Sequence, residues 1–220
     1  MPERKNKMHF KVCCIQSIAE AEMAIEAGAW AIGLVADMPS GPGPIDDNII
    51  REIAEAAKNR VHRFLLTSRT QADDVVKHIN TCGTDIVQLV DEVPVETYGA
   101  IRTNCPDVQI VQVIHVQDET ALRKAKAAEP FVDMILLDSG QPNAATKTLG
   151  GTGQTHNWAL SQQIVQSTSK PVWLAGGLNA DNVGAAISRV RPFGVDLCSG
   201  IRDTKGALIP SRLAQFAAKL

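Results

Sequence analysis

The chain has 220 residues, of which 45% are hydrophobic and 21% charged, and its 22 Lys and Arg against 24 Asp and Glu give a formal net charge of −2. A near-neutral charge without a basic block argues against nucleic acid or an anionic membrane as a standing partner. No apolar run reaches the ~18–20 residues that cross a bilayer, and the start of the chain lacks the apolar stretch of a secretion signal. We expect one domain over residues 1–220 in a cytoplasmic protein.

Short apolar runs rich in β-branched residues or Leu recur along the chain and predict eight strands. They span His9–Ile15, Ala29–Val35, Val61–Leu66, Asp85–Leu89, Val108–Val113, Val132–Asp138, Pro171–Ala175 and Gly194–Cys198. Helical patterns follow them at Ile18–Ala27, Asp46–Lys58, Thr70–Thr81, Val95–Asn104, Asp118–Glu129, Asn157–Ser167, Ala180–Arg189 and Pro210–Leu220. The strand runs are nearly continuous in apolar residues, which is typical of a parallel sheet buried on both faces.

Eight strands that alternate with eight helices indicate an α/β protein, with a sheet either open and doubly wound or closed into a barrel. The number of repeats, with a length a little under the usual ~250 residues, favours a (β/α)8 TIM barrel. Active sites of such barrels lie at the C-terminal ends of the strands, so the residues that close each strand are the first candidates.

The glycine-rich turns after the last two strands predict a phosphate site. Gly176 and Gly177 lie between the seventh strand and its helix, and Ser199 and Gly200 follow the eighth. Glycine lets the main chain approach an anion, a helix N-terminus favours negative charge, and these two loops are the usual phosphate site of a barrel. A tight turn without a ligand is the alternative reading.

Two strand ends carry groups for proton transfer. Cys13 ends the first strand, so its thiol is a candidate base or nucleophile, although free cysteine is often only a core residue. Asp138 closes a very apolar run, where burial raises a carboxyl pKa and suits a general acid, although it could also tether the following segment. Asp196 is a weaker candidate that could equally bond backbone amides, and Cys14 is expected to point away from Cys13 into the packing.

The remaining cysteines and histidines predict no further chemistry. The five cysteines are odd in number, and no CxxC or Cys/His cluster has ligand spacing, so we expect neither a disulfide scaffold nor a structural zinc. No His stands with a Ser or Asp in a pattern that indicates a catalytic triad, so a hydrolase has no support from the sequence.

Taken together in chain order, these segments resemble the phosphoribosylanthranilate isomerase family, whose motifs are matched over almost the full length. The matching segments are Lys11-Val-Cys13 with Ile15, Asp85–Leu89, Leu136–Asp138, Gly150-Gly-Thr-Gly153 with Trp158, Leu174–Asn179 with Asn182 and Val183, and Arg191–Asp196 with Ser199-Gly200. The resemblance implies a barrel of the ribulose-phosphate-binding type and an Amadori rearrangement of a phosphorylated aminoribose in tryptophan biosynthesis.

The resemblance also implies roles for the candidate residues. Asp138 would be the general acid that opens the furanose ring, and Cys13 the general base that removes the C2′ proton. Gly176, Gly177, Ser199 and Gly200 would bind the phosphate, and Gly153 and Asp196 would contact the substrate. The partner implied is a small phosphorylated sugar, with no cofactor and no metal. A monomer and a homodimer both stay open.

The chain departs from the family pattern in the loops around the expected site. Gly43 stands where the second loop of the family carries an arginine, and Cys14 stands where glycine usually follows the first strand. Val90-Asp91 replaces the usual His-Gly of the fourth strand end, and Arg202 reverses a charge after Ser199-Gly200. Arg202 is a candidate to supply the positive charge that Gly43 lacks.

Three functions therefore compete. The first is the isomerase acting through Cys13 and Asp138. The second is a divergent phosphate-binding barrel that senses or acts on another sugar phosphate, in which the lost loop arginine marks a lost activity. The third is a lyase or decarboxylating synthase, which needs a catalytic lysine and has only Lys11 near a strand end.

Overall fold

The structure is a computed structural model, and it describes residues 8–39, 41–139 and 157–220. Eight parallel strands close into a barrel in sequence order, with β8 paired to β1. The strands are β1 (His9–Val12), β2 (Ala31–Val35), β3 (His62–Thr67), β4 (Ile86–Leu89), β5 (Gln109–His115), β6 (Met134–Asp138), β7 (Val172–Leu174) and β8 (Gly194–Leu197). The predicted (β/α)8 barrel is confirmed.

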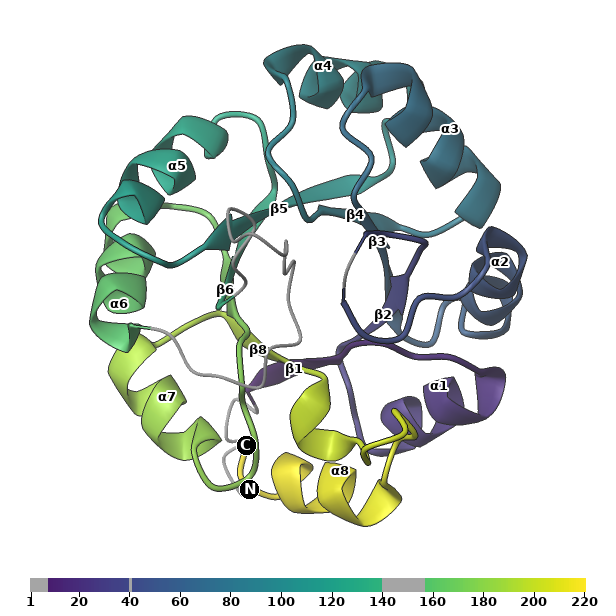
Figure 1. Cartoon of the computed structure of the whole chain (residues 1–220), viewed down its shortest axis with the longest axis vertical. Helices are drawn as coiled ribbons and strands as arrows, with labels where there is room; N and C mark the ends of the chain where they lie inside the picture. The colour runs from purple at the N-terminus through teal and green to yellow at the C-terminus, as the bar shows by residue number, and fades with distance from the viewer. Residues whose placement is uncertain (1–7, 40, 140–156) are drawn as a thin grey trace, which may run out of the picture.

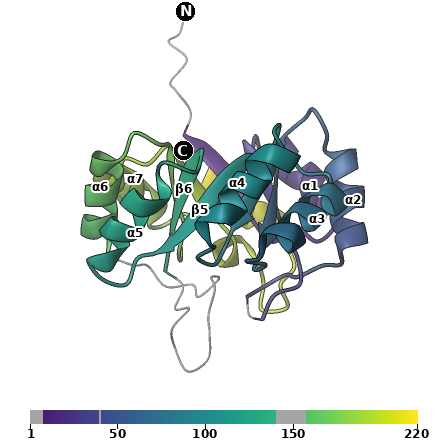
Figure 2. The ribbon, with the colours of Figure 1, turned by 90° about the horizontal axis from the view of Figure 1, so that it is seen from above.

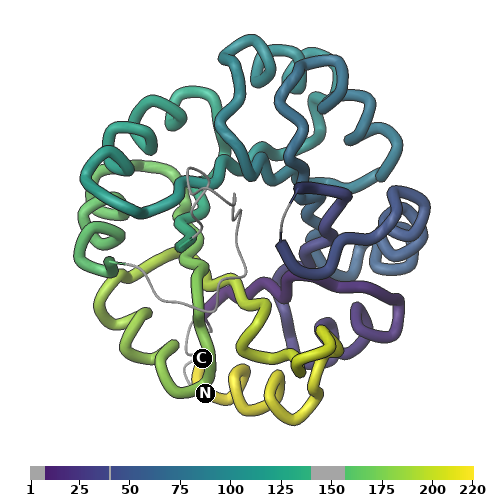
Figure 3. The backbone as a smooth tube through the Cα atoms, in the orientation of Figure 1, coloured from purple at the N-terminus to yellow at the C-terminus, as the bar shows by residue number. Residues whose placement is uncertain are grey.

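Helices surround the barrel as an outer ring (Figures 1 and 2). They are α1 (Ile18–Glu26), α2 (Asp47–Ala56), α3 (Ala72–Cys82), α4 (Val95–Asn104), α5 (Thr120–Ala128), α6 (Trp158–Ser167), α7 (Val183–Val190) and α8 (Pro210–Ala217), with a short 3₁₀ turn, η1 (Ser199–Ile201), after β8. The backbone trace shows the purple first strand lying beside the yellow-green last strand, which closes the ring (Figure 3). None of the described helices is long and apolar enough to cross a membrane.

Three helices begin two or three residues later than their patterns predict. Polar side chains before them form local turns: Asn179 Oδ1 accepts hydrogen bonds from the backbone N–H groups of Asp181 and Asn182, and Asp118 Oδ1 accepts one from Thr120. Asx turns of this kind compete with the first helical turn. The helix predicted from Thr70 likewise begins at Ala72.

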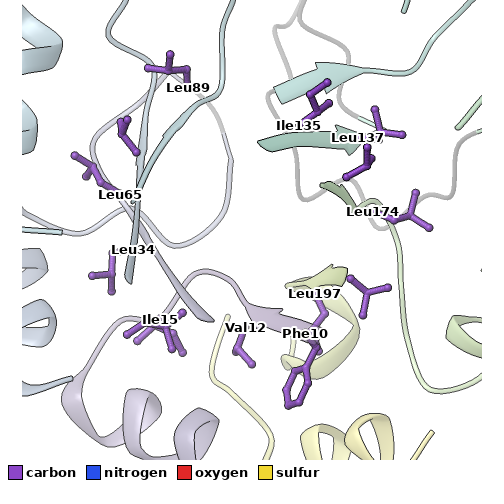
Figure 4. Close-up of a cluster of buried hydrophobic side chains, with 14 of the residues drawn as sticks. Phe10, Val12, Ile15, Leu34, Leu65, Leu89, Ile135, Leu137, Leu174 and Leu197 are labelled. Atoms are coloured by element: carbon purple, nitrogen blue, oxygen red, sulfur yellow. The ribbon is translucent and has the colours of Figure 1, made fainter. Parts of the chain in front are cut away.

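Strand side chains alternate between two apolar layers. In β3, Leu65 faces the helices, whereas Phe64 and Leu66 face the barrel interior. Figure 4 shows the outward layer, in which Leu34, Leu65 and Leu174 project from the barrel wall toward the surrounding helices. Burial of each such side chain contributes roughly 1.5–3 kcal/mol, so this layer holds the helices against the sheet.

Aromatic rings fill the barrel interior toward the N-terminal ends of the strands. The fully buried Trp173 donates its indole N–H to Sδ of Met134 at 3.3 Å, and its ring lies 6.0 Å from that of Phe64 and 5.5 Å from that of Phe193. Gly194 makes room for it, because a Cβ there would lie 2.5 Å from the indole ring. This aromatic layer therefore separates the cavity at the C-terminal ends of the strands from a second hollow beside Trp30 and His62 at their N-terminal ends.

Candidate active site

A cavity opens at the C-terminal ends of the strands. Its walls include Cys13 from the end of β1, Gln88 from β4, Asp138 from β6, Asp196 from β8 and Ser199 from η1. Residues from distant parts of the sequence meet here because parallel strands all point their carboxyl ends to one face of the barrel.

A buried ion pair lies beneath the cavity, with its Asp196 member in the cavity wall. Lys11 of β1 is fully buried, and its Nζ lies 3.0 Å from Oδ2 of Asp196 and 2.9 Å from Oε1 of Gln88. The same ammonium lies 4.8 Å from the centre of the Phe64 ring. Burial alone would lower the pKa of Lys11, but the charges of Asp196 and Cys13 outweigh it, and the net pKa is raised. Lys11 therefore stays protonated and places a fixed positive charge under the cavity.

Asp138 is a carboxyl group held in an apolar setting at the end of β6. It is 7% exposed, and burial raises its pKa to about 6. The backbone N–H of Ser139 donates to its Oδ1 at 2.7 Å, and this bond and the charge of Lys11 oppose the effect of burial without cancelling it. A carboxyl with this pKa exchanges a proton near neutral pH, which suits a general acid.

Cys13 combines burial with groups that favour its thiolate. Its backbone N–H donates to the carbonyl of Leu197, and Gly33 of β2 leaves room for the sulfur, since a Cβ there would lie 2.9 Å from Sγ of Cys13. A hydrogen bond from the Cys14 thiol lowers the pKa of Cys13; burial opposes this, and the charge of Lys11 adds to it. The net pKa is lowered, as a general base requires.

Cys14 does not point away from Cys13 as its place in a strand predicts. Strand β1 ends at Val12, and Cys14 adopts a left-handed backbone with φ of 63°, so the alternation of strand side chains no longer applies. Cys14 lines the same cavity as Cys13, and its Sγ lies 2.7 Å from Sγ of Cys198. Hydrogen bonds to Cys13 and Cys198, together with burial, raise the pKa of Cys14 well above its usual value.

The two glycine-rich turns lie against each other on one side of the cavity. Gly176 and Gly177 both have positive φ angles, of 89° and 63°, and the side chain of Asn182 donates to the carbonyl of Gly177. A Cβ on Gly200 would lie 2.2 Å from the carbonyl oxygen of Leu178, so only glycine fits where η1 meets the turn after β7. Gly176, Gly177 and Ser199 line the cavity, whereas the predicted phosphate ligand Gly200 is not among the lining residues and packs against Leu178 and Asn179.

Arg202 lies outside the set of cavity-lining residues. Its guanidinium bonds both carboxylate oxygens of Glu20, at 3.0 and 3.1 Å, and the carbonyl of Cys13 at 3.1 Å. It thus ties α1 and the segment after η1 to the end of β1. A contact between Arg202 and substrate stays a prediction. Gly153, the other predicted contact in a loop, lies outside the described residues.

One group within the described residues has the composition of a metal site. Ligand atoms of Asp47, His78 and Cys82 lie within 4.8 Å of one another on α2 and α3. His78 already bonds Asp47 through Nε2 at 3.0 Å and Thr67 through Nδ1 at 2.9 Å. Burial raises the pKa of the Cys82 thiol to about 12, which disfavours the thiolate that a metal would need. The group is accounted for as a hydrogen-bonded link between two helices.

Gln88 and Cys14 line the cavity and Lys11 lies beneath it, although the pattern of strand ends does not single them out. The period of two in β1 does put Lys11 on the face of Cys13, but nothing local to the sequence gives its partners, 77 and 185 positions further on.

Comparison with known proteins shows which family this chain matches. The model of the family described as N-(5'phosphoribosyl)anthranilate (PRA) isomerase matches residues 10–217. N-(5'-phosphoribosyl)anthranilate isomerase 2 of Methanosarcina mazei is 34% identical over 200 residues, which are 90% of this chain and 88% of that protein.

Solved structures give the same result. The crystal structure of phosphoribosyl anthranilate isomerase from Thermotoga maritima is 27% identical, has a TM-score of 0.81, and aligns over 96% of this chain and 98% of its own. A phosphoribosyl anthranilate isomerase in complex with reduced 1-(o-carboxyphenylamino)-1-deoxyribulose 5-phosphate is 25% identical, with a TM-score of 0.78 over 96% and 97% of the two chains.

Proposed function

Because the chain belongs to the phosphoribosylanthranilate isomerase family, we propose that it catalyses the Amadori rearrangement of N-(5′-phosphoribosyl)anthranilate to the 1-deoxyribulose 5-phosphate aminoketose, in tryptophan biosynthesis. The observation that carries the proposal is the meeting of Cys13, Asp138 and the glycine turns around one cavity.

Asp138 is the general acid of the proposed reaction. It donates its proton to the ring oxygen, the bond from that oxygen to C1′ breaks, and the anthranilate nitrogen supplies the electron pair that forms a Schiff base. A pKa of about 6 supports this role, because the protonated carboxyl persists at neutral pH far more than at an exposed aspartate.

Cys13 is the general base. Its thiolate removes the C2′ proton from the Schiff base, and the electrons of that C–H bond form an enolamine, which tautomerises to the ketone. The lowered pKa of Cys13 and the fixed positive charge of Lys11 support the thiolate form. Asp196 shares that charge and lines the cavity, where its carboxylate is available to a ribose hydroxyl.

The phosphate binds at the turns after β7 and β8. The left-handed glycines Gly176 and Gly177 turn the main chain toward the cavity, α7 begins shortly after them, and Ser199-Gly200 packs against them. Backbone N–H groups at such turns bind anions, and the helix dipole adds to the attraction.

A lyase mechanism through Lys11 has no support from its setting. A Schiff-base lysine needs a neutral amine, whereas the pKa of Lys11 is raised and its ammonium is paired with Asp196. The non-catalytic phosphate barrel is the second candidate, favoured by Gly43 in the loop where the family carries arginine.

The decisive experiment follows the loss of substrate fluorescence as purified protein consumes phosphoribosylanthranilate generated in place. We expect turnover that falls by at least about 10²–10⁴-fold in Cys13→Ala and in Asp138→Asn, and that persists in Cys105→Ala, whose sulfur lies after α4 away from the cavity. Turnover that survives in either site variant would overturn the assigned roles. No turnover in the wild type, with a melting temperature still raised by inorganic phosphate, would establish the second candidate.

A further inference from the structure

Cys14 and Cys198 form a sulfur pair at the mouth of the barrel. Their Sγ atoms are 2.7 Å apart, and they follow two neighbouring strands, β1 and β8, whose register pairs Val12 with Leu197. The sulfurs need to approach by only about 0.7 Å to reach the ~2.05 Å of a disulfide bond.

The pair is accessible from the cavity. Both side chains line it, and Cys198 is partly exposed, whereas Cys14 is 3% exposed. A small oxidant therefore meets Cys198 first. Cys14 lies behind it as the resolving thiol, with its Sγ 2.7 Å from that of Cys198.

We propose that Cys14 and Cys198 form a reversible disulfide, an oxidation site beside the candidate active site. With a small-molecule disulfide such as oxidised glutathione, the Cys198 thiolate attacks one sulfur, the S–S bond breaks, and one glutathione thiolate leaves. Cys14 then loses its proton and attacks the Cys198 sulfur of the mixed disulfide, which releases the second glutathione. Two protein thiols are oxidised, one disulfide is reduced, and the two protons end on the two glutathione thiols.

The disulfide would act on Cys13 through the hydrogen bond it removes. Cys13 and Cys14 line the same cavity, and the hydrogen bond from the Cys14 thiol is the foremost cause of the lowered pKa of Cys13. A disulfide sulfur has no proton to donate. Oxidation therefore raises the pKa of Cys13 and lowers the fraction of thiolate. This consequence for turnover rests on the proposed function; the formation of the bond does not.

The chemical test uses oxidised glutathione, alkylation of the remaining thiols, and mass spectrometry of tryptic peptides without reduction. We expect a cross-link between the peptide that contains Cys13 and Cys14 and the peptide that contains Cys198, with the loss of two hydrogen atoms, reversed by dithiothreitol. Cys13→Ala retains this cross-link, Cys14→Ala and Cys198→Ala lose it, and Cys105→Ala is the matched control that retains it. Absence of the cross-link, or its persistence in Cys14→Ala, would overturn the proposal whether or not the protein is an isomerase.

The activity test compares each protein with itself before and after oxidation. We expect the turnover of the cross-linked wild type at neutral pH to fall by about tenfold or more and to recover with dithiothreitol. In its pH profile, the limb that reports Cys13 should move to higher pH. Cys198→Ala should keep its own initial turnover after the same treatment. Full turnover in completely cross-linked protein would overturn the regulatory consequence.

Discussion

Cys14 occupies the space that a side chain at Gly43 would need: a Cβ built on Gly43 would lie 2.8 Å from the Cβ of Cys14. The two residues depart from the family pattern in separate loops, yet they touch above the cavity. Both have left-handed backbones, with φ of 71° at Gly43 and 63° at Cys14. A side chain at position 43 is therefore incompatible with the present position of Cys14.

This contact predicts a coupling between the two positions. Gly43→Ala should lower the free energy of unfolding by about 1–3 kcal/mol, because its Cβ collides with Cys14. In a Cys14→Gly background the same substitution should cost at least about 1 kcal/mol less. Urea unfolding of the four proteins in the cycle measures this coupling energy.

The matched control is Gly206→Ala. Gly206 also has a left-handed φ, of 87°, but a Cβ there meets nothing within 4 Å. The loss of unfolding free energy in Gly206→Ala should reflect backbone strain alone, about 1 kcal/mol, and should not depend on Cys14. Equal costs for Gly43→Ala with and without Cys14 would contradict the contact.

Asp138→Asn should stabilise the protein at neutral pH. A carboxyl whose pKa is raised by burial to about 6 in the folded state, against about 3.9 unfolded, is costly to ionise in the fold. Between these two pKa values the folded protein binds more protons than the unfolded protein does. The stability of the wild type therefore falls relative to that of the variant as the pH rises from about 4 to about 6. Above that the variant gains up to about 3 kcal/mol.

Urea unfolding of Asp138→Asn and wild type at pH 4 and pH 8 tests the linkage. Asp107→Asn, the same substitution at an exposed position, serves as the matched control. A stability difference that is the same at both pH values would be inconsistent with a raised pKa at Asp138.

The pH profile of kcat/KM should break near pH 6. The proposed reaction needs Asp138 protonated and Cys13 deprotonated, so rising pH lowers the protonated fraction of Asp138 through about 6 and raises the thiolate fraction of Cys13 through the pKa of that thiol. Whichever pKa is lower, the product of the two fractions is bell-shaped and has one limb near pH 6. Steady-state rates from pH 5 to 9 measure it, and Asp138→Glu should move that limb while leaving the other in place.

Breaking the buried ion pair should be costly. Lys11→Met leaves the Asp196 carboxylate buried without its partner and should lower the free energy of unfolding by about 3–5 kcal/mol. Adding Asp196→Asn removes the stranded charge and should restore most of the loss. Denaturant melts of the single and double variants test this, with Lys58→Met, which breaks the exposed Lys58–Glu55 pair, as a control with little effect. A Lys11→Met protein as stable as wild type would refute the assigned role of this pair.

The proposed phosphate site in the turns after β7 and β8 predicts opposite outcomes for two glycines. Gly200→Ala forces a Cβ to 2.2 Å from the carbonyl of Leu178, so the turns must separate and phosphate affinity should fall. Gly184→Ala lies within α7 with nothing within 4 Å, and should raise stability by roughly 0.5–1 kcal/mol without weakening phosphate binding. Titration calorimetry with inorganic phosphate measures the phosphate affinity of both variants. An unchanged affinity in Gly200→Ala would argue against this phosphate site.

The order of strands and helices was predictable because buried parallel strands are continuous apolar runs and helices repeat at 3.6 residues. Strand ends then pointed to Cys13 and Asp138 without knowledge of the contacts. The bend after Val12 was not predictable, because the rule of alternating side chains assumes that the strand continues through Cys14. The position of Cys14 therefore had to come from the backbone conformation.

Charged side chains show the same limit. The sequence marks Arg202 as a charge near the phosphate turn, but its partner Glu20 lies 182 positions away, and the ion pair exists only once β8 closes against β1. The sign of a charged side chain can be predicted from the sequence. Its ion-pair partner cannot, because residues that are distant in the sequence become neighbours only in the folded chain.

Trp173 and the rings around it also close one end of the cavity. The indole, with Gly194 beneath its edge, fills the barrel below the ion pair of Lys11, so the cavity does not continue to the far end of the strands. In the proposed isomerase the cavity has this one closed end, so substrate would enter and product would leave on the side of the glycine turns. Because the product carries the same phosphate as the substrate, the two compounds would exclude each other from that site.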